Sequence, residues 1–415
     1  MNPGKYSFGI GDRFGRQGES LLAAIMKADK VGVGITPVWN KSHREHTIIG
    51  TTPAAVRAEA DEAAKSMMRE KDYFVDADHI TLKNVDAFIE SSDFFTLDAA
   101  EFIGQRPSRD EIDNFIDGCV KYIDGLTVAG IEDNLLVTEN VARTIAIKYL
   151  SAVKQAGRIY RHIASKKGVG NFVVELSMDE AEAAQTPVEL FFILAAAAQE
   201  ELPVQTIAPK FTGRFNKGVD YKGDVERFAR EFEWDLAVIR YAVEEFGLPR
   251  NLKLSVHSGS DKFSIYGAIN KALRKFDAGL HIKTAGTTWL EELAGLALAE
   301  GEYLGIAKRI YAGAYSRLEE LREPYLKVTD IDQSKLPSPE VVAEWNGRKF
   351  AETLKHDTSC GRYNPDFRQL LHIGYKVAAE MRTEFTDAIA DCQRIIGPNV
   401  TENIYQRHIK PIFID

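Results

Sequence analysis

Short apolar runs alternate with longer amphipathic stretches along most of the chain. Several of the runs are apolar at nearly every position, which is the pattern of parallel strands that are buried on both faces. The stretches between them carry apolar residues at helical spacing, as in Val141–Lys166 and Val225–Phe246. The eight candidate strands are Tyr6–Ile10, Val31–Val38, Tyr73–Val75, Phe94–Leu97, Phe172–Leu176, Thr206–Ala208, Lys253–Val256 and Gly279–Ile282.

The repeated strand-then-helix order predicts a parallel sheet covered by helices. Eight strands favour an α/β fold of the closed (β/α)₈ TIM type, and an open doubly wound sheet is the structural alternative. The acidic segment 103–138 interrupts the order and is interpreted as a helical insertion. We expect a catalytic barrel domain over 1–301 and, over 302–415, a helical C-terminal extension packed on the barrel.

Composition excludes several classes of protein. The net charge of −9 over 415 residues argues against a nucleic-acid partner. No run approaches 18 apolar residues and the first residues lack a signal-peptide pattern, so we expect a cytoplasmic protein without membrane contact. Cys119, Cys360 and Cys392 are far apart, which predicts neither a disulfide framework nor a thiolate zinc site.

The first polar cluster is DADHIT at 76–81, directly after a candidate strand. In a barrel, residues that follow strands gather at the mouth where active sites of this fold are built. Two carboxylates beside His79 suit metal ligation next to a base. The alternative is a loop whose aspartates cap the next helix.

A second cluster surrounds Glu175, which lies inside an otherwise apolar strand. A buried carboxylate is costly unless it is paired, protonated or bound to a metal. Its pKa would tend to rise, which suits a general acid or base. A structural ion pair is the alternative. Asp179, Glu180 and Glu182 are expected to begin a helix, where acids complement the helix dipole.

The loop PKFTGRFNKGVDY at 209–221 carries three cations with glycines and aromatics. An arginine fork and lysine charges can bind the carboxylate of a substrate, although a solvated basic loop has the same composition. The turn after the next strand and the last strand add further polar groups. The candidate substrate-binding residues are Lys210, Arg214, Asp261, Lys262 and Lys283.

Three histidines lie near the ends of three candidate strands: His79, His257 and His281. A single histidine on an apolar strand is more often a core residue than a ligand, but three in one predicted barrel favour a shared site. With Glu175 they form a mixed nitrogen and oxygen set typical of Zn²⁺, Mn²⁺ or Co²⁺. The segment GIGDRFG at 9–15 has the wrong glycine spacing for a dinucleotide fingerprint.

Four segments carry a resemblance to a known family. DADHIT at 76–81, PKFTGRFNKGVDY at 209–221, LSVHSGSDKFSIY at 254–266 and LHIKTAGTTWLEE at 280–292 resemble the tagaturonate/fructuronate epimerases, also called hexuronate C4-epimerases. The resemblance covers nearly the whole chain. It implies a metal-dependent barrel that acts on keto-hexuronates in the catabolism of uronic acids.

The resemblance also implies residue roles. Asp78 would be the proton acceptor and Glu175 the proton donor, while His79, His257 and His281 would hold a divalent metal cation. The sequence does not decide among Zn, Mn, Co and Ni, and a homo-oligomer is an open option. A metal-dependent aldolase or lyase acting on sugar acids would use the same groups. A non-catalytic sugar-acid binding protein would need the cations but not the histidines.

Carbon 4 of a 2-keto-hexuronate is β to the carbonyl, so simple enolisation does not make its hydrogen acidic. Transient oxidation would need a nicotinamide, for which no fingerprint is present. Retro-aldol cleavage of the C3–C4 bond fits ordinary metal chemistry and is the favoured route. Direct deprotonation at carbon 4 is the alternative.

Overall fold

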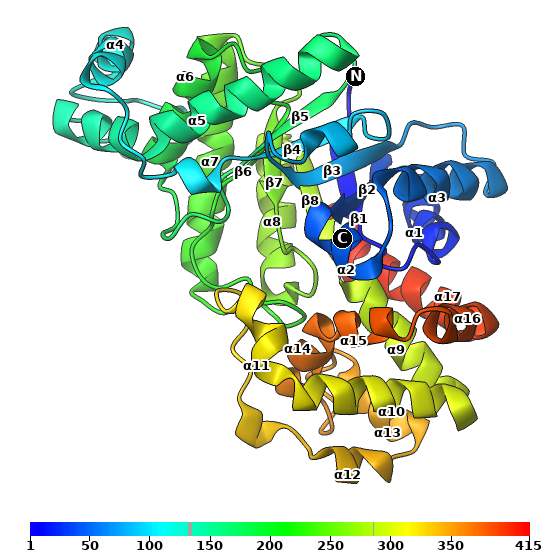
Figure 1. The fold of residues 1–415 in the computed structure, drawn as a ribbon. Coiled ribbons are helices and arrows are strands. Elements are labelled where there is room, and N and C mark those ends of the chain that lie inside the picture. Colours follow the sequence, from blue (N-terminus) through cyan, green and yellow to red (C-terminus); the bar gives the residue numbers. More distant parts are fainter. Residues whose placement is uncertain (132–134, 285) are drawn as a thin grey trace.

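Eight parallel strands close into a barrel in sequence order, from β1 to β8 (Figure 1). The computed structural model describes residues 1–131, 135–284 and 286–415. The barrel confirms the predicted fold, and the closure between β1 and β8 excludes the open sheet. The strands are β1 Tyr6–Ile10, β2 Ile35–Ser42, β3 Phe74–Ile80, β4 Phe94–Asp98, β5 Val173–Ser177, β6 Thr206–Ala208, β7 Lys253–Val256 and β8 Leu280–Thr284.

Two strands differ from their predicted bounds in a way that matters for the site. The second strand begins four residues later than expected and continues through polar residues to Ser42. The third continues through the whole of Asp76–Ile80, which we had expected to follow the strand. The second strand starts later because Val31 still caps the end of the helix before it. The third continues because its inward polar side chains pair with other strands, as Asp76 does with Thr96 and Lys283.

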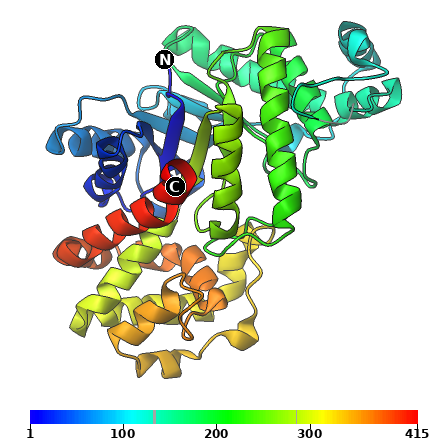
Figure 2. The same cartoon turned by 180° about the vertical axis from the view of Figure 1, so that it is seen from behind.

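Helices cover the outside of the barrel (Figures 1 and 2). The two longest, over 139–167 and 225–246, match their predicted positions closely. The predicted insertion contains α4 and a short bridge between Leu126 and Leu135. Among the described residues, no helix is long and apolar enough to cross a bilayer. The helices of the barrel part are α1 Gly18–Lys30, α2 His43–Ile49, α3 Pro53–Ser66, η1 Val85–Ala87, η2 Ala100–Phe102, α4 Arg109–Cys119, η3 Val120–Tyr122, α5 Glu139–Lys167, α6 Pro187–Gln199, α7 Val225–Phe246, α8 Phe263–Phe276 and α9 Thr287–Ala299.

The C-terminal region is helical and lies beyond the carboxyl ends of the strands (Figure 1). Its last helix, η6, returns to the barrel and packs between α1 and α8, where the helix after the eighth strand of a regular barrel would lie (Figure 2). The helices of this region are α10 Gly301–Ser316, α11 Leu318–Arg322, η4 Glu323–Tyr325, η5 Gln333–Lys335, α12 Pro339–Ala343, α13 Gly347–Leu354, α14 Pro365–Ile373, α15 Tyr375–Glu380, α16 Thr383–Asp391, α17 Gln393–Glu402 and η6 Asn403–Ile414.

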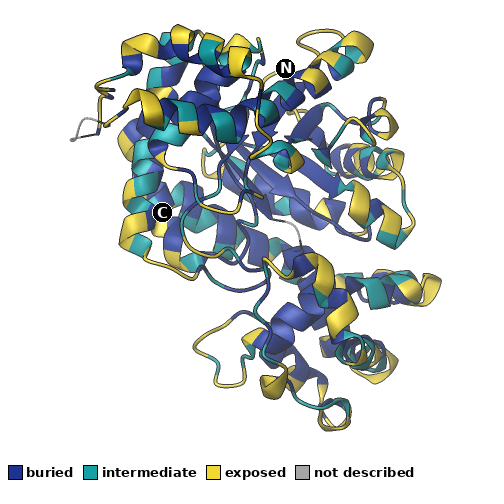
Figure 3. Ribbon diagram, turned by 60° about the vertical axis from the view of Figure 1, so that its left-hand side comes forward, coloured by how far each residue is buried: buried dark blue, intermediate teal, exposed yellow. Residues whose placement is uncertain are grey.

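The barrel interior is layered from an apolar base to a polar mouth. Val38, Phe74, Phe94 and Val173 form an apolar cluster of their own inside the strands. Because side chains alternate along a strand, the inward positions two residues further on are Asn40, Asp76, Thr96 and Glu175. Most strand residues are buried and none is exposed, and the exposed residues lie on the helices and in the loops (Figure 3). Asp76 and Glu175 therefore lie directly above an apolar layer of the barrel interior.

Candidate metal centre and its neighbouring carboxylates

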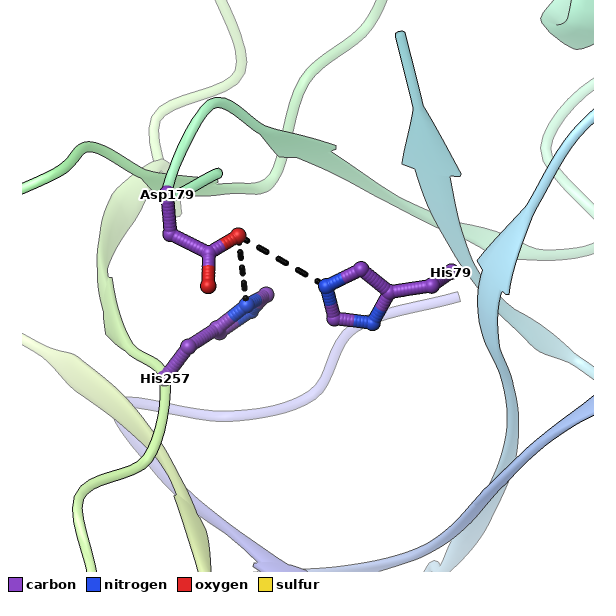
Figure 4. Close-up of side chains that lie close together, drawn as sticks. All are labelled: His79, Asp179 and His257. Carbon is purple, nitrogen blue, oxygen red and sulfur yellow. Dashed lines mark ion pairs between the residues drawn. The ribbon is translucent and has the colours of Figure 1, made fainter. Parts of the chain in front are cut away.

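Three side chains from three segments converge at the barrel mouth: His79, Asp179 and His257 (Figure 4). One ligand atom of each lies within 4.8 Å of the other two. Oδ1 of Asp179 is 3.2 Å from Nδ1 of His257 and 3.6 Å from Nε2 of His79. Two imidazoles and a carboxylate are a donor set typical of first-row divalent metals.

The local backbone explains how His79 reaches this group. In a regular strand, His79 would face away from its inward neighbour Asp78. The pairing between β3 and β4 shifts register between Ala77 and Ile80, and His79 adopts a left-handed conformation with φ of 55°. Such bulges change the direction of a side chain, so both Asp78 and His79 are available at the mouth. Strained backbone of this kind is often found at functional sites.

The donor atoms fit a cation better than they fit one another. Nδ1 of His257 is buried and makes no hydrogen bond of good geometry within the described part of the chain. The 3.6 Å between Nε2 of His79 and Oδ1 of Asp179 is too long for a hydrogen bond. Each imidazole instead uses its other nitrogen. Nδ1 of His79 lies 2.9 Å from Asp78, and Nε2 of His257 lies 2.7 Å from Glu175. Carboxylates that hold the far nitrogen in this way orient histidine ligands in metal sites.

Lys283 joins these two carboxylates to a third. Its ammonium lies 2.7 Å from Asp76, 2.8 Å from Asp78 and 2.8 Å from Glu175, and it also donates to Thr96. The side chain crosses the barrel where β1 carries Gly9. A Cβ on that residue would lie only 3.0 Å from Cγ of Lys283. One lysine thus supplies a counter-charge that three buried acids share.

Burial and pairing set the protonation of these groups. Burial alone would raise the pKa of Asp78 and of Glu175, but Lys283 and the neighbouring histidines hold both pKa values well below their usual range. Burial raises the pKa of Asp76 to about 7 against the opposing effect of Lys283. Burial would lower the pKa of His79, yet Asp78 and Asp179 raise it well above its usual value. A bound divalent metal would take the place of the imidazole protons, because histidine ligates in its neutral form.

The structure places the third expected ligand, His281, elsewhere. Its Nδ1 lies 2.9 Å from the hydroxyl of Ser7, its ring centroid is 5.2 Å from that of Phe94, and the side chain is fully buried. Burial lowers its pKa to about 3, so the ring is neutral. His281 is not part of the ligand group formed by the described residues, and Asp179 contributes the third donor instead.

The two cations expected to bind substrate in the loop 209–221 differ in exposure, and Lys210 is half-buried. Arg214 is exposed, and its backbone pairs with that of Lys222 in a small hairpin. The backbone N–H of Lys210 donates to Gln185. The structure shows no contact between either side chain and the ligand group.

Asp261 and Lys262 are enclosed by protein. The carboxylate of Asp261 lies 2.9 Å from the guanidinium of Arg368 in α14, and the Lys262 ammonium donates to the carbonyls of Asn216, Val219 and Ser260. Burial lowers the pKa of Lys262 to about 7. These contacts join the β7–α8 loop to neighbouring loops and to the C-terminal region.

Sequence reasoning missed Asp179 because acids after a strand were expected to begin a helix. That helix, α6, begins eight residues later at Pro187, where Thr186 and Glu189 form a reciprocal capping box. The motif Thr-Pro-Val-Glu is a readable start signal, since it pairs a capping residue with proline in the first turn and glutamate three residues on. Asp179 is left in the loop and accepts a 2.6 Å hydrogen bond from Ser177.

Comparison with known proteins assigns the family. The family model described as tagaturonate epimerase, UxaE, matches residues 1–395. The chain belongs to the tagaturonate epimerase family. It is therefore an isomerase. A tagaturonate/fructuronate epimerase from Thermotoga maritima is 27% identical over 385 residues, which cover 89% of this chain and 72% of that protein.

Solved structures agree on the fold. The glycerol-complexed fructuronate-tagaturonate epimerase UxaE from Cohnella laeviribosi superposes with a TM-score of 0.82 at 22% identity, covering 99% of this chain and 82% of that one. A probable tagatose 6 phosphate kinase from Sinorhizobium meliloti superposes with a TM-score of 0.51 at 11% identity, covering 99% of each chain. At these identities the likeness establishes the barrel and its helical region, and the site must be argued from this chain's own residues.

Proposed function

We propose that this epimerase interconverts D-tagaturonate and D-fructuronate at carbon 4 and needs a divalent cation to do so. The observation that supports this proposal most directly is the group of His79, Asp179 and His257 beside the Asp78–Lys283–Glu175 network. It combines a cation site with proton-transfer groups at one barrel mouth. The named activity of the Thermotoga maritima relative supports the choice of substrates.

His79, Asp179 and His257 would hold the cation, with Asp78 and Glu175 fixing the two rings from behind. When bound, a divalent cation supplies Lewis acidity to a substrate carbonyl or hydroxyl. The donor set suits Zn²⁺, Mn²⁺, Co²⁺ or Ni²⁺ and does not choose among them.

Asp78 is the better placed of the two carboxylates for direct contact with substrate. Its side chain keeps 11% of its surface exposed at the mouth, whereas Glu175 is fully enclosed. We assign Asp78 as the group that takes a proton from substrate. Glu175 exchanges protons through Lys283 or His257, both of which it contacts. Asp78 thus remains the proton acceptor and Glu175 the proton donor, but Glu175 acts through a neighbouring side chain and not by direct contact with substrate.

Two routes use these groups differently. In the retro-aldol route, Asp78 takes the proton of the carbon-4 hydroxyl, the C3–C4 bond breaks, and an aldehyde and an enediolate form. The aldehyde turns and the bond re-forms on its other face, returning the proton to oxygen. In direct deprotonation, the hydrogen on carbon 4 itself leaves and another arrives on the opposite face. We favour the retro-aldol route because it avoids an unstabilised carbanion.

Substrate labelled with deuterium at carbon 4 separates the routes. Retention of the label in the epimer formed in ordinary water is the expected result. Its loss to solvent would make carbon 4 the site of proton exchange and rule out the retro-aldol route. Accumulation of free three-carbon products without epimer would indicate a lyase instead.

The need for a cation is tested by removing it. Treatment with a chelator should abolish epimerisation, and Mn²⁺, Co²⁺, Ni²⁺ or Zn²⁺ should restore it. Elemental analysis of the His257→Ala variant should show loss of the bound metal, with a far-ultraviolet circular dichroism spectrum like that of the parent. Full activity in protein that elemental analysis finds free of metal would overturn the proposed metal dependence.

A further inference from the structure

The substrate carboxylate sets a geometric requirement for the cation that binds it. A keto-hexuronate carries its carboxylate at carbon 6, only two bonds from carbon 4. The cation that binds it must therefore lie beside the group of His79, Asp179 and His257. Neither Lys210 nor Arg214 shows a contact there.

We propose that Lys217, supported by Arg13 and His372, binds the carbon-6 carboxylate and makes the enzyme selective for sugar acids. The assignment rests on the proposed function and deepens it. It concerns the same barrel mouth, but a part of it built jointly by the loop 209–221 and the C-terminal region.

Lys217 lies next to the candidate metal centre. Its ammonium donates a 2.8 Å hydrogen bond to the hydroxyl of Ser258, the residue that follows His257. Burial lowers the pKa of Lys217, the charge of Arg13 lowers it further, and Asp179 opposes both effects. The lysine thus lies within electrostatic reach of a metal-centre carboxylate on one side and a guanidinium on the other. An anion at this point would relieve the repulsion between the two cations.

Arg13 is held rigidly for such a role. It is buried, its Nε lies 3.2 Å from Glu45, and its Nη1 donates a 2.7 Å hydrogen bond to the carbonyl of His372. The guanidinium also lies 3.9 Å from the ring centroid of Tyr375. A planar guanidinium fixed by stacking is suited to recognising a carboxylate.

His372 supplies the third polar group. Its side chain is 1% exposed, and neither ring nitrogen has a hydrogen-bond partner within the described residues. A Cβ added to Gly218 would lie 3.3 Å from Cδ2 of His372, so the ring reaches the same loop that carries Lys217. Burial, Arg13 and Lys217 lower its pKa well below the usual range. A neutral imidazole without a partner can still donate one hydrogen bond to a carboxylate.

The C-terminal region holds these groups in place. The backbone N–H of Lys217 donates a 2.8 Å hydrogen bond to Val328, and both His372 and Tyr375 belong to helices of that region. The region therefore acts as a fixed wall of the substrate site.

The test compares a charged substrate with an uncharged one of the same carbon skeleton. The Lys217→Met variant should lose about 30-fold or more in kcat/KM for D-tagaturonate, the equivalent of roughly 2 kcal/mol at 1.4 kcal/mol per tenfold. Its epimerisation of D-tagatose, which carries a hydroxymethyl group at carbon 6, should change by less than threefold or improve. Lys217→Arg should recover part of the loss on the uronate. Lys271→Met, an exposed change on α8, serves as the control for the lysine-to-methionine exchange.

A binding measurement adds a readout that does not depend on turnover. Inhibition by the sugar acid L-galactonate, which has a carboxylate in the place of carbon 6 of D-tagaturonate, should weaken in Lys217→Met by a factor similar to the kcat/KM loss. Inhibition by uncharged galactitol should stay constant. Metal content should equal that of the parent protein.

The outcomes separate this inference from the proposed function. A parent protein that epimerises neither substrate would refute the proposed function itself. A parent that is active on D-tagaturonate, with a Lys217→Met variant equally impaired on both substrates, would refute only the carboxylate assignment. The competing assignment would stand if Lys210→Met or Arg214→Met reduced the preference for uronate more than Lys217→Met did.

Discussion

Replacing Lys283 by methionine tests whether one ammonium stabilises the polar interior of the barrel. The Lys283 side chain is 4% exposed and lies within 2.8 Å of Asp76, Asp78 and Glu175. Methionine keeps much of the volume and removes the charge. Breaking a buried ion pair costs about 3–5 kcal/mol because the partner charge is left uncompensated. Since folded proteins are stable by about 5–15 kcal/mol, this loss should be a large fraction of the total.

The loss should depend on pH with a definite sign. In the parent protein, Lys283 holds the pKa of Asp78 and of Glu175 below the unfolded value, so its stabilisation is present above pH of about 4 and is lost on acidification. Asp76, with a pKa of about 7, is partly protonated near neutrality and contributes less. In the variant, buried carboxylates without a counter-charge acquire raised pKa values. The destabilisation should therefore be largest at pH 8 and smaller at pH 5.5.

Urea unfolding followed by circular dichroism measures this effect, with a chelator present so that metal binding does not contribute to the free energy of unfolding. We expect a loss of about 3–5 kcal/mol at pH 8. Lys271→Met, at an exposed position, should change the free energy by about 0.5 kcal/mol or less. Adding Asp78→Asn to Lys283→Met should recover part of the loss, because it removes one uncompensated charge. A loss below about 1 kcal/mol, or one equal at both pH values, would refute the reasoning.

Three further predictions concern residues outside this network. His281→Gln should keep the metal content of the parent and lower the melting temperature, whereas His257→Gln should lose metal; equal metal loss from both would make His281 a ligand. Arg368→Met leaves the buried charge of Asp261 unpaired, so it should cost about 3–5 kcal/mol and speed limited proteolysis of the C-terminal region, and an unchanged digestion rate would contradict this. Burial lowers the pKa of Lys253 to about 7, so the unfolded state binds more protons between pH 7 and 10 and stability rises with pH across that window. Lys253→Met should flatten this rise in a urea titration, and an identical slope would show that Lys253 is not its source.

The barrel could be predicted because its strands are short apolar runs with helical stretches between them. The predicted ends of two strands were wrong because mainly polar residues continue each strand, over Trp39–Ser42 and Asp76–Ile80. Hydrophobic pattern marks a strand only while its side chains face apolar surroundings. Near the mouth the inward side chains pair with charged partners from other strands, and those partners are unknown until the strands are assembled.

The bulge at His79 is a second feature that the pattern of apolar and polar residues does not predict. Alternation assigns Asp78 and His79 to opposite faces of a strand, so a regular strand could supply only one of them to the mouth. The sequence placed both in a loop and for that reason predicted both as site residues. The structure brings both to the mouth by a different means, a register shift with φ of 55° at His79. No residue type in DADHI requires that conformation, since none of the five is glycine.

Depth along the barrel axis explains why His281 lies apart from the other histidines. In the pairing of β7 with β8, His281 is level with Ser255, which precedes His257 by two residues. Two residues of strand correspond to roughly 6.6 Å, so His281 lies about one layer below His257. Both histidines come near the ends of short apolar runs, and only the register between the strands separates them. Register depends on which residues are level with one another across the closed barrel, here Ser7 with His281 and Gly9 with Lys283. The sequence therefore shows a residue's type and the face of the strand on which it lies. It does not show the residue's depth along the barrel axis, and that depth decides whether a histidine can be a ligand or belongs to the core.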